Sequence, residues 1–335
     1  MSAEGTSIGI YDEAIVIDAL NVSNWDSPAV YKSLHSGGLT AINATIAVWE
    51  NYQGTMDNIA AWSRRFRKYE DILVHATSVK DILQAKKDGK VGLIFGWQNA
   101  SSIENDLGHL AEFHALGVRI VQITYSDSNL LGSGYRERAD AGLTNFGVGA
   151  IKEMNRLGIL IDLSHVGDRT TMEAIELSEQ PVSFTHANAR SFGVNRERNK
   201  SDEALKFMTE RGGIVGANAH PSFLSKGFES TVQDFVDVID DLVGRVGIDH
   251  VGIGTDYTQD QPKAFYDWIF AYQGTIYRER TTPMPDPVVH PIGMETPERL
   301  SSVAQELLDR GYKQTDIIKV LGDNWLRLFQ EVWGE

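Results

Sequence analysis

Residues 158–186 read GILIDLSHVGDRTTMEAIELSEQPVSFTH and contain two short apolar runs, 158–165 (GILIDLSH) and 181–186 (PVSFTH), each ending on a histidine. The runs are almost continuously apolar rather than alternating, which is typical of parallel strands buried on both faces. Similar runs recur at 15–20, 39–47, 91–97, 120–125, 212–217 and 250–256, separated by longer amphipathic stretches such as 145–157 and 231–246. Eight such strands with eight crossovers predict an α/β fold, a (β/α)₈ TIM barrel.

Glycine and proline positions agree with this pattern. LGV (116–118) and LGI (157–159) place a glycine at a helix end directly before the next strand. After the eighth strand a proline-rich stretch, 281–291, precedes two expected C-terminal helices at 296–310 and 315–332, the first capped by Thr296. The absence of repeats, charge blocks and low-complexity linkers predicts a single domain over residues 1–335. A doubly wound open sheet is the alternative fold, disfavoured because no strand is followed by a glycine-rich phosphate loop.

The composition excludes several kinds of site and partner. The 335 residues include no cysteine, which excludes disulfides, a cysteine nucleophile and thiolate metal ligands. A formal net charge of −15 disfavours binding to nucleic acid or to an anionic membrane surface. No apolar run reaches the roughly 20 residues that span a bilayer, and the first residues lack the segments of a secretion signal. We therefore expect a cytoplasmic protein that acts on a small molecule.

Three of the predicted strands end on residues that can bind a metal: His165, His186 and Asp256. In barrels of this kind the active site lies at the C-terminal ends of the strands. Two imidazoles and a carboxylate there predict a Zn²⁺ site with an open position for water. A single histidine at a strand end is more often a hydrogen-bonded structural residue, but three such residues at three strand ends favour a metal site.

Longer motifs resemble those of the membrane (renal) dipeptidase family of metallopeptidases. They are IDLSHVG (161–167), THANAR (185–190), ERNKSDEAL (197–205) and HVGIGTDY (250–257), with further matches at 16–25, 92–101, 116–126 and 317–329. The resemblance spans almost the whole chain. It implies a (β/α)₈ barrel which, in typical members, holds two zinc ions bridged by a glutamate and a hydroxide and hydrolyses dipeptides.

The resemblance also implies roles for individual residues. His165 and His186 match the two histidines of one metal site, and Asp256 matches the aspartate that binds the other metal and handles the proton. Arg198 matches the arginine that binds the substrate's C-terminal carboxylate, a role that suits a bidentate guanidinium. Because the loop is one residue longer than usual, Arg196 is an alternative for this role, and an ordinary surface arginine is the alternative for both.

Four positions depart from the family pattern. The two metal ligands of the first strand, a His-x-Asp pair, correspond to Leu20 and Val22, which have no lone pair to offer. The bridging glutamate corresponds to Gln98, and a histidine that polarises the scissile carbonyl corresponds to Tyr125. Three of these changes affect the same metal site. We therefore expect that site to be lost and a single divalent ion, zinc, to be bound at the other.

The sequence thus predicts a metal-dependent hydrolase in which Asp256 is both a metal ligand and the group that moves the proton. Gln98 and Tyr125 are expected to donate hydrogen bonds to the substrate or to oxyanion charge, and Arg198 to select a small carboxylate-bearing amide or dipeptide-like substrate. His220, in GANAHP (216–221), is either a pocket-facing ligand or base or a packed loop residue.

Two alternatives stay open for the function. One is a non-hydrolytic metal enzyme of lyase type, and the other is a non-catalytic protein of the same fold that binds a small molecule. A homodimer is expected, because similar proteins are often dimers.

Overall fold

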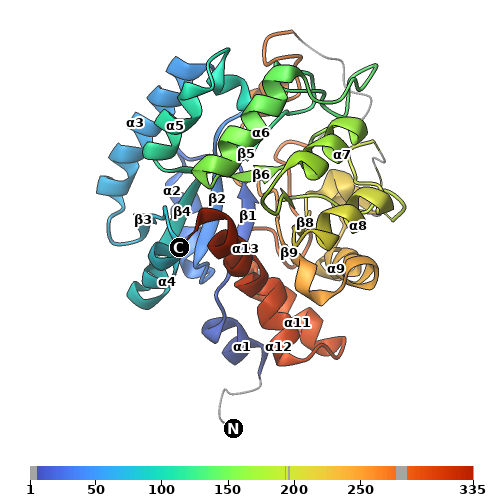
Figure 1. Ribbon diagram of the computed structural model, residues 1–335. Coiled ribbons are helices and arrows are strands. Elements are labelled where there is room, and N and C mark those ends of the chain that lie inside the picture. The colour runs from blue at the N-terminus through green and yellow to red at the C-terminus, as the bar shows by residue number, and fades with distance from the viewer. Residues whose placement is uncertain (1–5, 193, 195–196, 277–284, 335) are drawn as a thin grey trace.

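The computed structural model describes residues 6–192, 194, 197–276 and 285–334. Its parallel strands follow one another in the order β2-β1-β9-β8-β7-β6-β5-β4, and β2 also pairs with β4, so that the sheet closes into a barrel (Figure 1). The strands of the barrel are β1 (Ile17–Asn21), β2 (Ala41–Ala47), β4 (Val91–Trp97), β5 (Val118–Gln122), β6 (Leu160–Asp162), β7 (Ser183–Phe184), β8 (Ile214–Ala217) and β9 (Val251–Ile253). The predicted (β/α)₈ barrel is confirmed.

A further strand, β3 (Leu73–His75), was missed by the sequence analysis. It pairs with residues 91–93 of β4, whereas β5 pairs with residues 95–97 of the same strand. β3 therefore extends the sheet outside the closed barrel. With only three residues, two of them half-buried, it lacks the continuous apolar run that marks the other strands.

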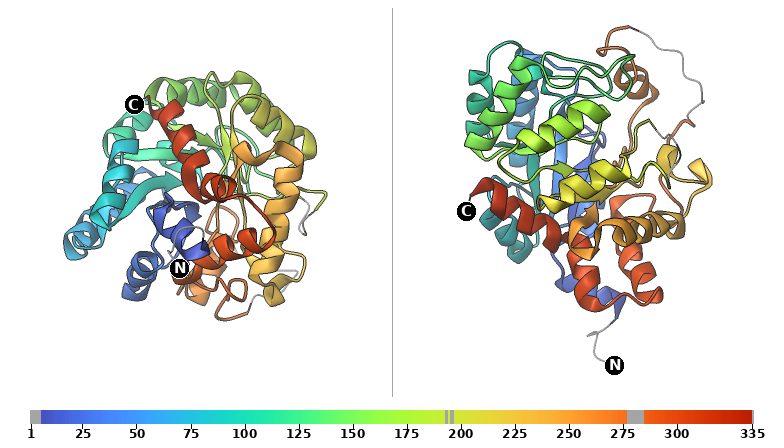
Figure 2. Two further views of the ribbon diagram at one scale, coloured as in Figure 1. Left: turned by 90° about the horizontal axis from the view of Figure 1, so that it is seen from below. Right: turned by 45° about the vertical axis from the view of Figure 1, so that its right-hand side comes forward.

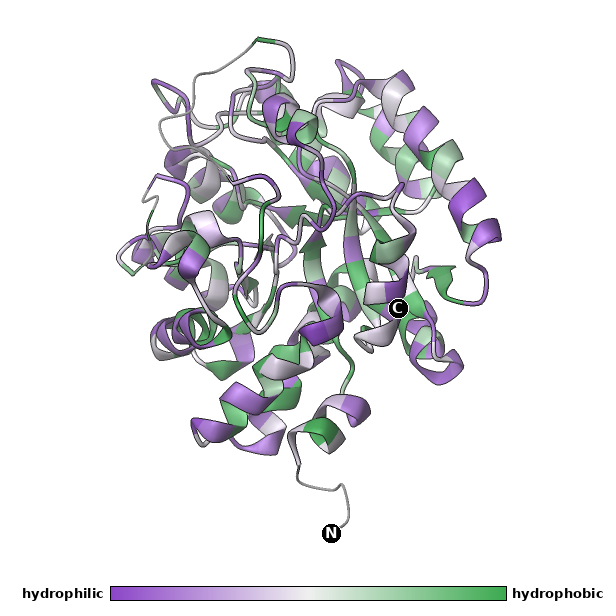
Figure 3. Ribbon diagram, turned by 180° about the vertical axis from the view of Figure 1, so that it is seen from behind, coloured by the Kyte–Doolittle hydropathy of each residue, from purple (hydrophilic) through white to green (hydrophobic). Residues whose placement is uncertain are grey.

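Helices surround the barrel, as the view along its axis in Figure 2 shows. They are α2 (Pro28–Ser36), α3 (Tyr52–Lys68), α4 (Val79–Asp88), α5 (Gly108–Ala115), α6 (Asn145–Leu157), α7 (Asp168–Leu177), α8 (Asp202–Glu210) and α9 (Val232–Val246). Their apolar faces pack on the strands and their outer faces are largely hydrophilic (Figure 3). The predicted helices at 145–157 and 231–246 correspond to α6 and α9.

The remaining elements are short or lie at the chain ends. Short helical turns are η1 (Ala100–Ile103), η2 (Pro221–Phe223), η3 (Gly227–Glu229), η4 (Ile248–His250) and η5 (Pro297–Arg299), and α10 (Lys263–Ile269) follows β9. α1 (Ser7–Glu13) contacts α11 (Ser301–Asp309), and both lie with α12 (Gln314–Ile318) at the bottom of Figure 1. Thr296 precedes η5 as predicted, but its side chain makes no capping hydrogen bond.

The last helix closes the bottom of the barrel. The segment predicted as one helix at 315–332 consists of α12, a π-helical turn at Lys319–Asp323 and α13 (Asn324–Trp333). Trp325 of α13 donates from its indole Nε1 to the carbonyl of Ile253 at 3.1 Å. This contact requires a glycine at position 252, since a Cβ there would lie 2.2 Å from the indole nitrogen. None of the described helices has the length and apolarity needed to cross a membrane.

Candidate active site at the C-terminal ends of the strands

His165 and His186 come together beyond the ends of two paired strands. β6 pairs with β7, and the two histidines follow these strands by three and two residues. Their Nε2 atoms are 3.1 Å apart, and both side chains are buried. The predicted meeting of the two imidazoles is therefore present.

A chain of hydrogen bonds fixes the tautomer of His186. The Thr185 hydroxyl donates to Asp162 Oδ2 at 2.6 Å, so it accepts from His186 Nδ1 at 2.7 Å. With the proton on Nδ1, His186 Nε2 carries a free lone pair. Histidines that bind metals typically have their second nitrogen held in this way.

The electrostatic surroundings keep both imidazoles neutral. Burial lowers the pKa of His165 and of His186 well below the usual value, and the charge of Arg198 lowers both further. Neutral imidazole is the form that binds a metal. Two nitrogens bound to one tetrahedral zinc ion lie about 3.3 Å apart, close to the separation of this pair. The histidine pair therefore fits two ligand positions of a single ion.

Asp256 is placed at the end of β9 in an unusual backbone conformation. Its φ of 58° lies in the left-handed region, which few residues other than glycine adopt and which is common at functional sites. Its Oδ2 accepts from Asn218 Nδ2 at 3.2 Å. Among the described residues, no group of three or more His, Cys, Asp or Glu side chains is placed to hold a metal. The structure does not bring Asp256 into such a set with the histidine pair, so its role as a ligand stays a prediction.

The β1 side of the barrel mouth has no metal-binding side chains at positions 20 and 22, where the family pattern has two ligands. Leu20 and Val22 are buried apolar side chains. Gln98 is also buried, and its amide nitrogen donates to Thr45 Oγ1 at 3.0 Å. Leu20 and Val22 offer no ligands for a second ion, and the number of ions that the site binds stays a prediction. That Gln98 also donates to a substrate stays a prediction.

Tyr125 packs directly on the histidine pair. Its ring is stacked on that of His165 with the ring centroids 4.1 Å apart, and Trp49 packs edge-on against its other side. Burial and the nearby Asp256 carboxylate raise the pKa of Tyr125, so its hydroxyl keeps its proton at neutral pH. The group can therefore act as a hydrogen-bond donor, the role that the sequence analysis predicts for it.

Arg198 is not a surface residue, and the alternative that it is an ordinary surface arginine is wrong. The side chain is 1% exposed and donates from Nη1 to the carbonyl of Ser164 at 2.7 Å and from Nη2 to that of His186 at 2.8 Å. Within the described part of the chain its Nε has no partner and no carboxylate forms an ion pair with the guanidinium. Arg196, the alternative for the same role, lies outside the described residues.

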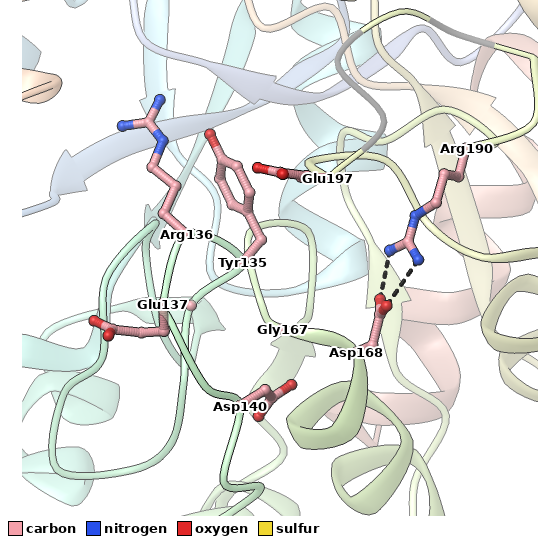
Figure 4. Close-up of a pocket in the computed structure, with 9 residues that line it drawn as sticks. Tyr135, Arg136, Glu137, Asp140, Gly167, Asp168, Arg190 and Glu197 are labelled. Carbon is pink, nitrogen blue, oxygen red and sulfur yellow. Dashed lines mark hydrogen bonds and ion pairs between the residues drawn. The ribbon is translucent and has the colours of Figure 1, made fainter.

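A cavity of about 420 Å³ lies near His165, although neither histidine of the pair lines it. Its lining comprises Gly134, Tyr135, Arg136, Glu137, Asp140, Gly167, Asp168, Arg190 and Glu197 (Figure 4). The Tyr135 ring belongs to this lining and lies near the His165 ring, with ring centroids 6.0 Å apart. On the opposite side Arg190 and Asp168 form a two-point ion pair. The cavity is large enough for a small polar molecule and bears charges of both signs.

A family model described as membrane dipeptidase (peptidase family M19) matches residues 13–269. The chain belongs to the membrane dipeptidase family. An amidohydrolase from Pseudomonas aeruginosa of known structure is 39% identical, with a TM-score of 0.94 over 98% of this chain and 99% of that one. An uncharacterized dipeptidase from Schizosaccharomyces pombe is 30% identical over 61% of this chain and 50% of that protein. The dipeptidase tcpJ of Claviceps purpurea is 28% identical over 83% of this chain and 60% of that protein.

The family membership inferred from the motifs is thus confirmed. The chain spans 50% and 60% of the lengths of the two curated dipeptidases that it matches. Membrane dipeptidases are metallopeptidases, so the family as a whole is metal-dependent. This member combines the family's fold with apolar residues at positions 20 and 22.

Three polar residues that organise the site were not predicted from the sequence: Asp162, Asn218 and Lys200. Asp162 orients His186 through Thr185, and a carboxylate inside the apolar run 158–165 is a signal that could have identified it. Asn218 donates to Asp256. Lys200 is fully buried and donates from Nζ to the carbonyl of Val166 at 2.8 Å. Nothing in a lysine within a polar motif predicts this burial, which depends on the packing of loops distant in sequence.

Proposed function

We propose that the chain is a metal-dependent hydrolase that cleaves small carboxylate-bearing amides or dipeptide-like substrates, with one divalent ion, zinc, bound by His165 and His186. The observation that carries this proposal is the pair of buried, neutral imidazoles whose Nε2 atoms are 3.1 Å apart. Catalytic zinc sites commonly have three protein ligands and one water or substrate position, and Asp256 stays the predicted third ligand.

Zinc bound there would polarise a carbonyl oxygen and lower the pKa of a bound water towards about 7. The residues of the chain supply the remaining steps. Asp256 has one carboxylate oxygen held by Asn218, which leaves the other to accept the proton of the attacking water and return it to the leaving nitrogen. The Tyr125 hydroxyl, protonated at neutral pH, donates to the substrate.

Arg198 binds the substrate carboxylate in this proposal. Its guanidinium is a buried cation oriented by two backbone carbonyls, and no carboxylate of the described residues forms an ion pair with it. A buried charge without a counterion is unfavourable, and an arriving carboxylate would remove that cost and complete a charge-assisted pair.

The relatives support an amide bond as the target. Those from the two fungi are called dipeptidases, and the one from P. aeruginosa is called an amidohydrolase. A second candidate function is the binding of a small molecule without hydrolysis. The apolar residues Leu20 and Val22, at positions where the family has ligands, support it. Classical dipeptides should in either case be poor substrates, because the two-ion bridge cannot form.

Metal analysis of the purified chain tests the proposal. We expect close to one tightly bound divalent ion per chain, and its loss in both His165→Ala and His186→Ala. His35→Ala is the matched control, because His35 lies on α2 and bonds to the carbonyl of Gly89, and it should retain the ion. Circular dichroism should show the same fold for all four proteins.

Two outcomes would contradict the proposal. No ion in the wild type, even after incubation with zinc or manganese, would favour the non-catalytic binding protein. Two ions per chain would mean that the β1 side has ligands other than the expected ones.

A further inference from the structure

His220 follows β8, and one hydrogen bond holds its backbone while another holds its ring. Its backbone N donates to Asn218 Oδ1 at 2.7 Å, and its Nδ1 accepts from the backbone N of Ser222 at 3.3 Å. A ring nitrogen that accepts from a backbone N–H must carry a lone pair. The proton of the neutral ring is therefore on Nε2.

The ring lies next to the groups assigned to catalysis. The Asn218 amide that accepts from the backbone of His220 also donates to Asp256 Oδ2 at 3.2 Å and to the carbonyl of His186 at 3.4 Å. The two imidazoles are close enough that a proton on His220 lowers the pKa of His186. His220 is thus linked through one side chain to both the candidate base and a candidate metal ligand.

Arg198 borders the same group. Phe223 lies 5.8 Å from the His220 ring, and the Arg198 guanidinium lies 5.4 Å above the Phe223 ring. A substrate whose carboxylate is held by Arg198 would therefore extend past His220 on its way to Asp256.

The Nε2–H of His220 is available to such a substrate. It donates to none of the described residues. It is also not fully buried, and the residue as a whole is 6% exposed. The neighbouring His290 differs: its Nε2 accepts from the backbone N of Thr258 at 3.0 Å, and its Nδ1 is a fully buried atom with no partner among the described residues. Of the two rings, His220 is the one with a donor that can reach a ligand.

We infer that His220 is a catalytic residue whose Nε2–H donates a hydrogen bond to the substrate oxygen that becomes negative as water adds to the carbonyl carbon. The inference rests on the proposed function. His220 keeps its proton throughout: the water proton passes to Asp256 and then to the leaving nitrogen as the C–N bond breaks. Burial lowers the pKa of His220, which suits a neutral donor better than a base that must become charged. The site would thereby have a donor on its β8 side in addition to Tyr125.

Two substitutions separate the two nitrogens of the ring. His220→Asn places a side-chain oxygen near Nδ1, where it can still accept from Ser222, but it removes the donor at Nε2. His220→Gln places an amide N–H near Nε2 and retains the donor. Zinc content and thermal unfolding of both variants should equal those of the wild type, because neither removes a proposed ligand.

The experiment measures zinc-loaded, full-length protein on the amide that the wild type cleaves fastest within a panel of N-acyl amino acids and dipeptides. Loss of one donor to an oxyanion typically lowers kcat about 10²–10³-fold, so His220→Asn should show this loss with little change in KM. His220→Gln should retain most of the activity. Binding of a phosphinate analogue of alanyl-alanine, which mimics the tetrahedral intermediate, should weaken by a similar factor in His220→Asn only.

Each other result would overturn the inference in a recognisable way. Equal kcat in His220→Asn and wild type, or a change confined to KM, would exclude a role at the reacting oxygen. Loss of zinc in either variant would make His220 a ligand instead. If the wild type cleaves no amide and does not bind the phosphinate, the proposed function fails and this inference fails with it.

Discussion

Two strand pairs at the mouth of the barrel use the same hydrogen-bond arrangement. In the β6–β7 pair, Thr185 donates to Asp162 from its backbone N at 3.0 Å and from Oγ1 at 2.6 Å. In the β1–β9 pair, Thr255 donates to Asp18 from its backbone N at 2.8 Å and from Oγ1 at 2.7 Å. The residue after the threonine has a proposed function in each pair: His186 follows Thr185, and Asp256 follows Thr255. A buried aspartate therefore helps to orient each of these two residues.

The two pairs differ in the residues that follow the aspartates. His165 stands three residues after Asp162, whereas Asn21 stands three residues after Asp18 and donates back to it at 3.2 Å. Leu20, also on this side, is buried and apolar. The β6–β7 pair presents two imidazoles, and the β1–β9 pair presents only the carboxylate of Asp256.

The scaffold of the barrel mouth is therefore separable from its chemistry. Hydrogen bonds between a strand aspartate and a threonine join neighbouring strand ends in both pairs, whether or not a metal ligand follows. Leu20 and Val22 can therefore stand at ligand positions without loss of the barrel, because these residues join β1 to the end of β9 through their backbone and not through their side chains. The function of the protein therefore depends on the residues of the site rather than on the fold.

Removal of Arg198 is expected to have the largest effect on the β6–β7 side. It donates to the carbonyls of Ser164 and His186. If it also binds the substrate carboxylate, Arg198→Ala removes a desolvated charge pair worth roughly 2–5 kcal/mol, or about 30- to several thousand-fold in kcat/KM. The measurement compares a carboxylate-bearing substrate with the same molecule amidated at that carboxylate.

The wild type should prefer the carboxylate-bearing form, and Arg198→Ala should abolish this preference. Arg198→Lys is the control, because it retains the charge but not the two-point geometry. Its preference for the carboxylate-bearing substrate should lie between those of the wild type and Arg198→Ala. An unchanged preference in Arg198→Ala would assign carboxylate binding to another residue, with Arg196 the first to test.

Some residues of this site could be predicted from the sequence and others could not. His165 and His186 could be predicted because each ends an apolar run, and a run of that kind fixes which end of the barrel its last residue occupies. The burial of Arg198 could not be predicted, because it depends on carbonyls at residues 164 and 186 that only the closed barrel brings to it. The relation of Asp256 to the histidine pair depends on backbone geometry at φ 58°, for which an aspartate in the sequence gives no signal.

The stability of the β1–β9 pair should depend on pH through Asp18. Burial raises the pKa of Asp18 from 3.8 to about 7, although four hydrogen bonds to Thr255, Asn21 and Leu20 oppose the shift. The folded state then binds a proton that the unfolded state has already released. This contribution to stability is fully present below pH about 4 and is lost as the pH rises through about 7, by up to roughly 4 kcal/mol.

Urea unfolding of the wild type and of Asp18→Asn at pH 4.5 and 7.5 tests this. The asparagine stays neutral, so the variant should be more stable relative to the wild type at pH 7.5 than at pH 4.5. Taking the difference between the two proteins removes the opposite contribution of the buried histidines, whose lowered pKa values favour folding as the pH rises. Parallel stability curves for the two proteins would contradict the prediction.

The two aspartates should differ in their effect on zinc binding. Asp162 accepts from the Thr185 hydroxyl, which leaves that oxygen to accept from His186 Nδ1 and keeps the lone pair on Nε2. In Asp162→Asn the amide nitrogen can donate to the same hydroxyl, so the tautomer of His186 is no longer fixed. Loss of such a partner behind a ligand typically lowers metal affinity about 10–100-fold.

Asp18→Asn makes the same chemical change in the same kind of hydrogen-bond arrangement, but no proposed ligand pair follows it. Competitive titration against a chelator should therefore show weaker zinc binding for Asp162→Asn and unchanged binding for Asp18→Asn. Thr185→Val, which removes the hydroxyl but keeps the side-chain shape, should reproduce the loss seen in Asp162→Asn. Equal losses in both asparagine variants would mean that the aspartates act only by holding the barrel mouth together, and that the β6–β7 pair has no special relation to the metal.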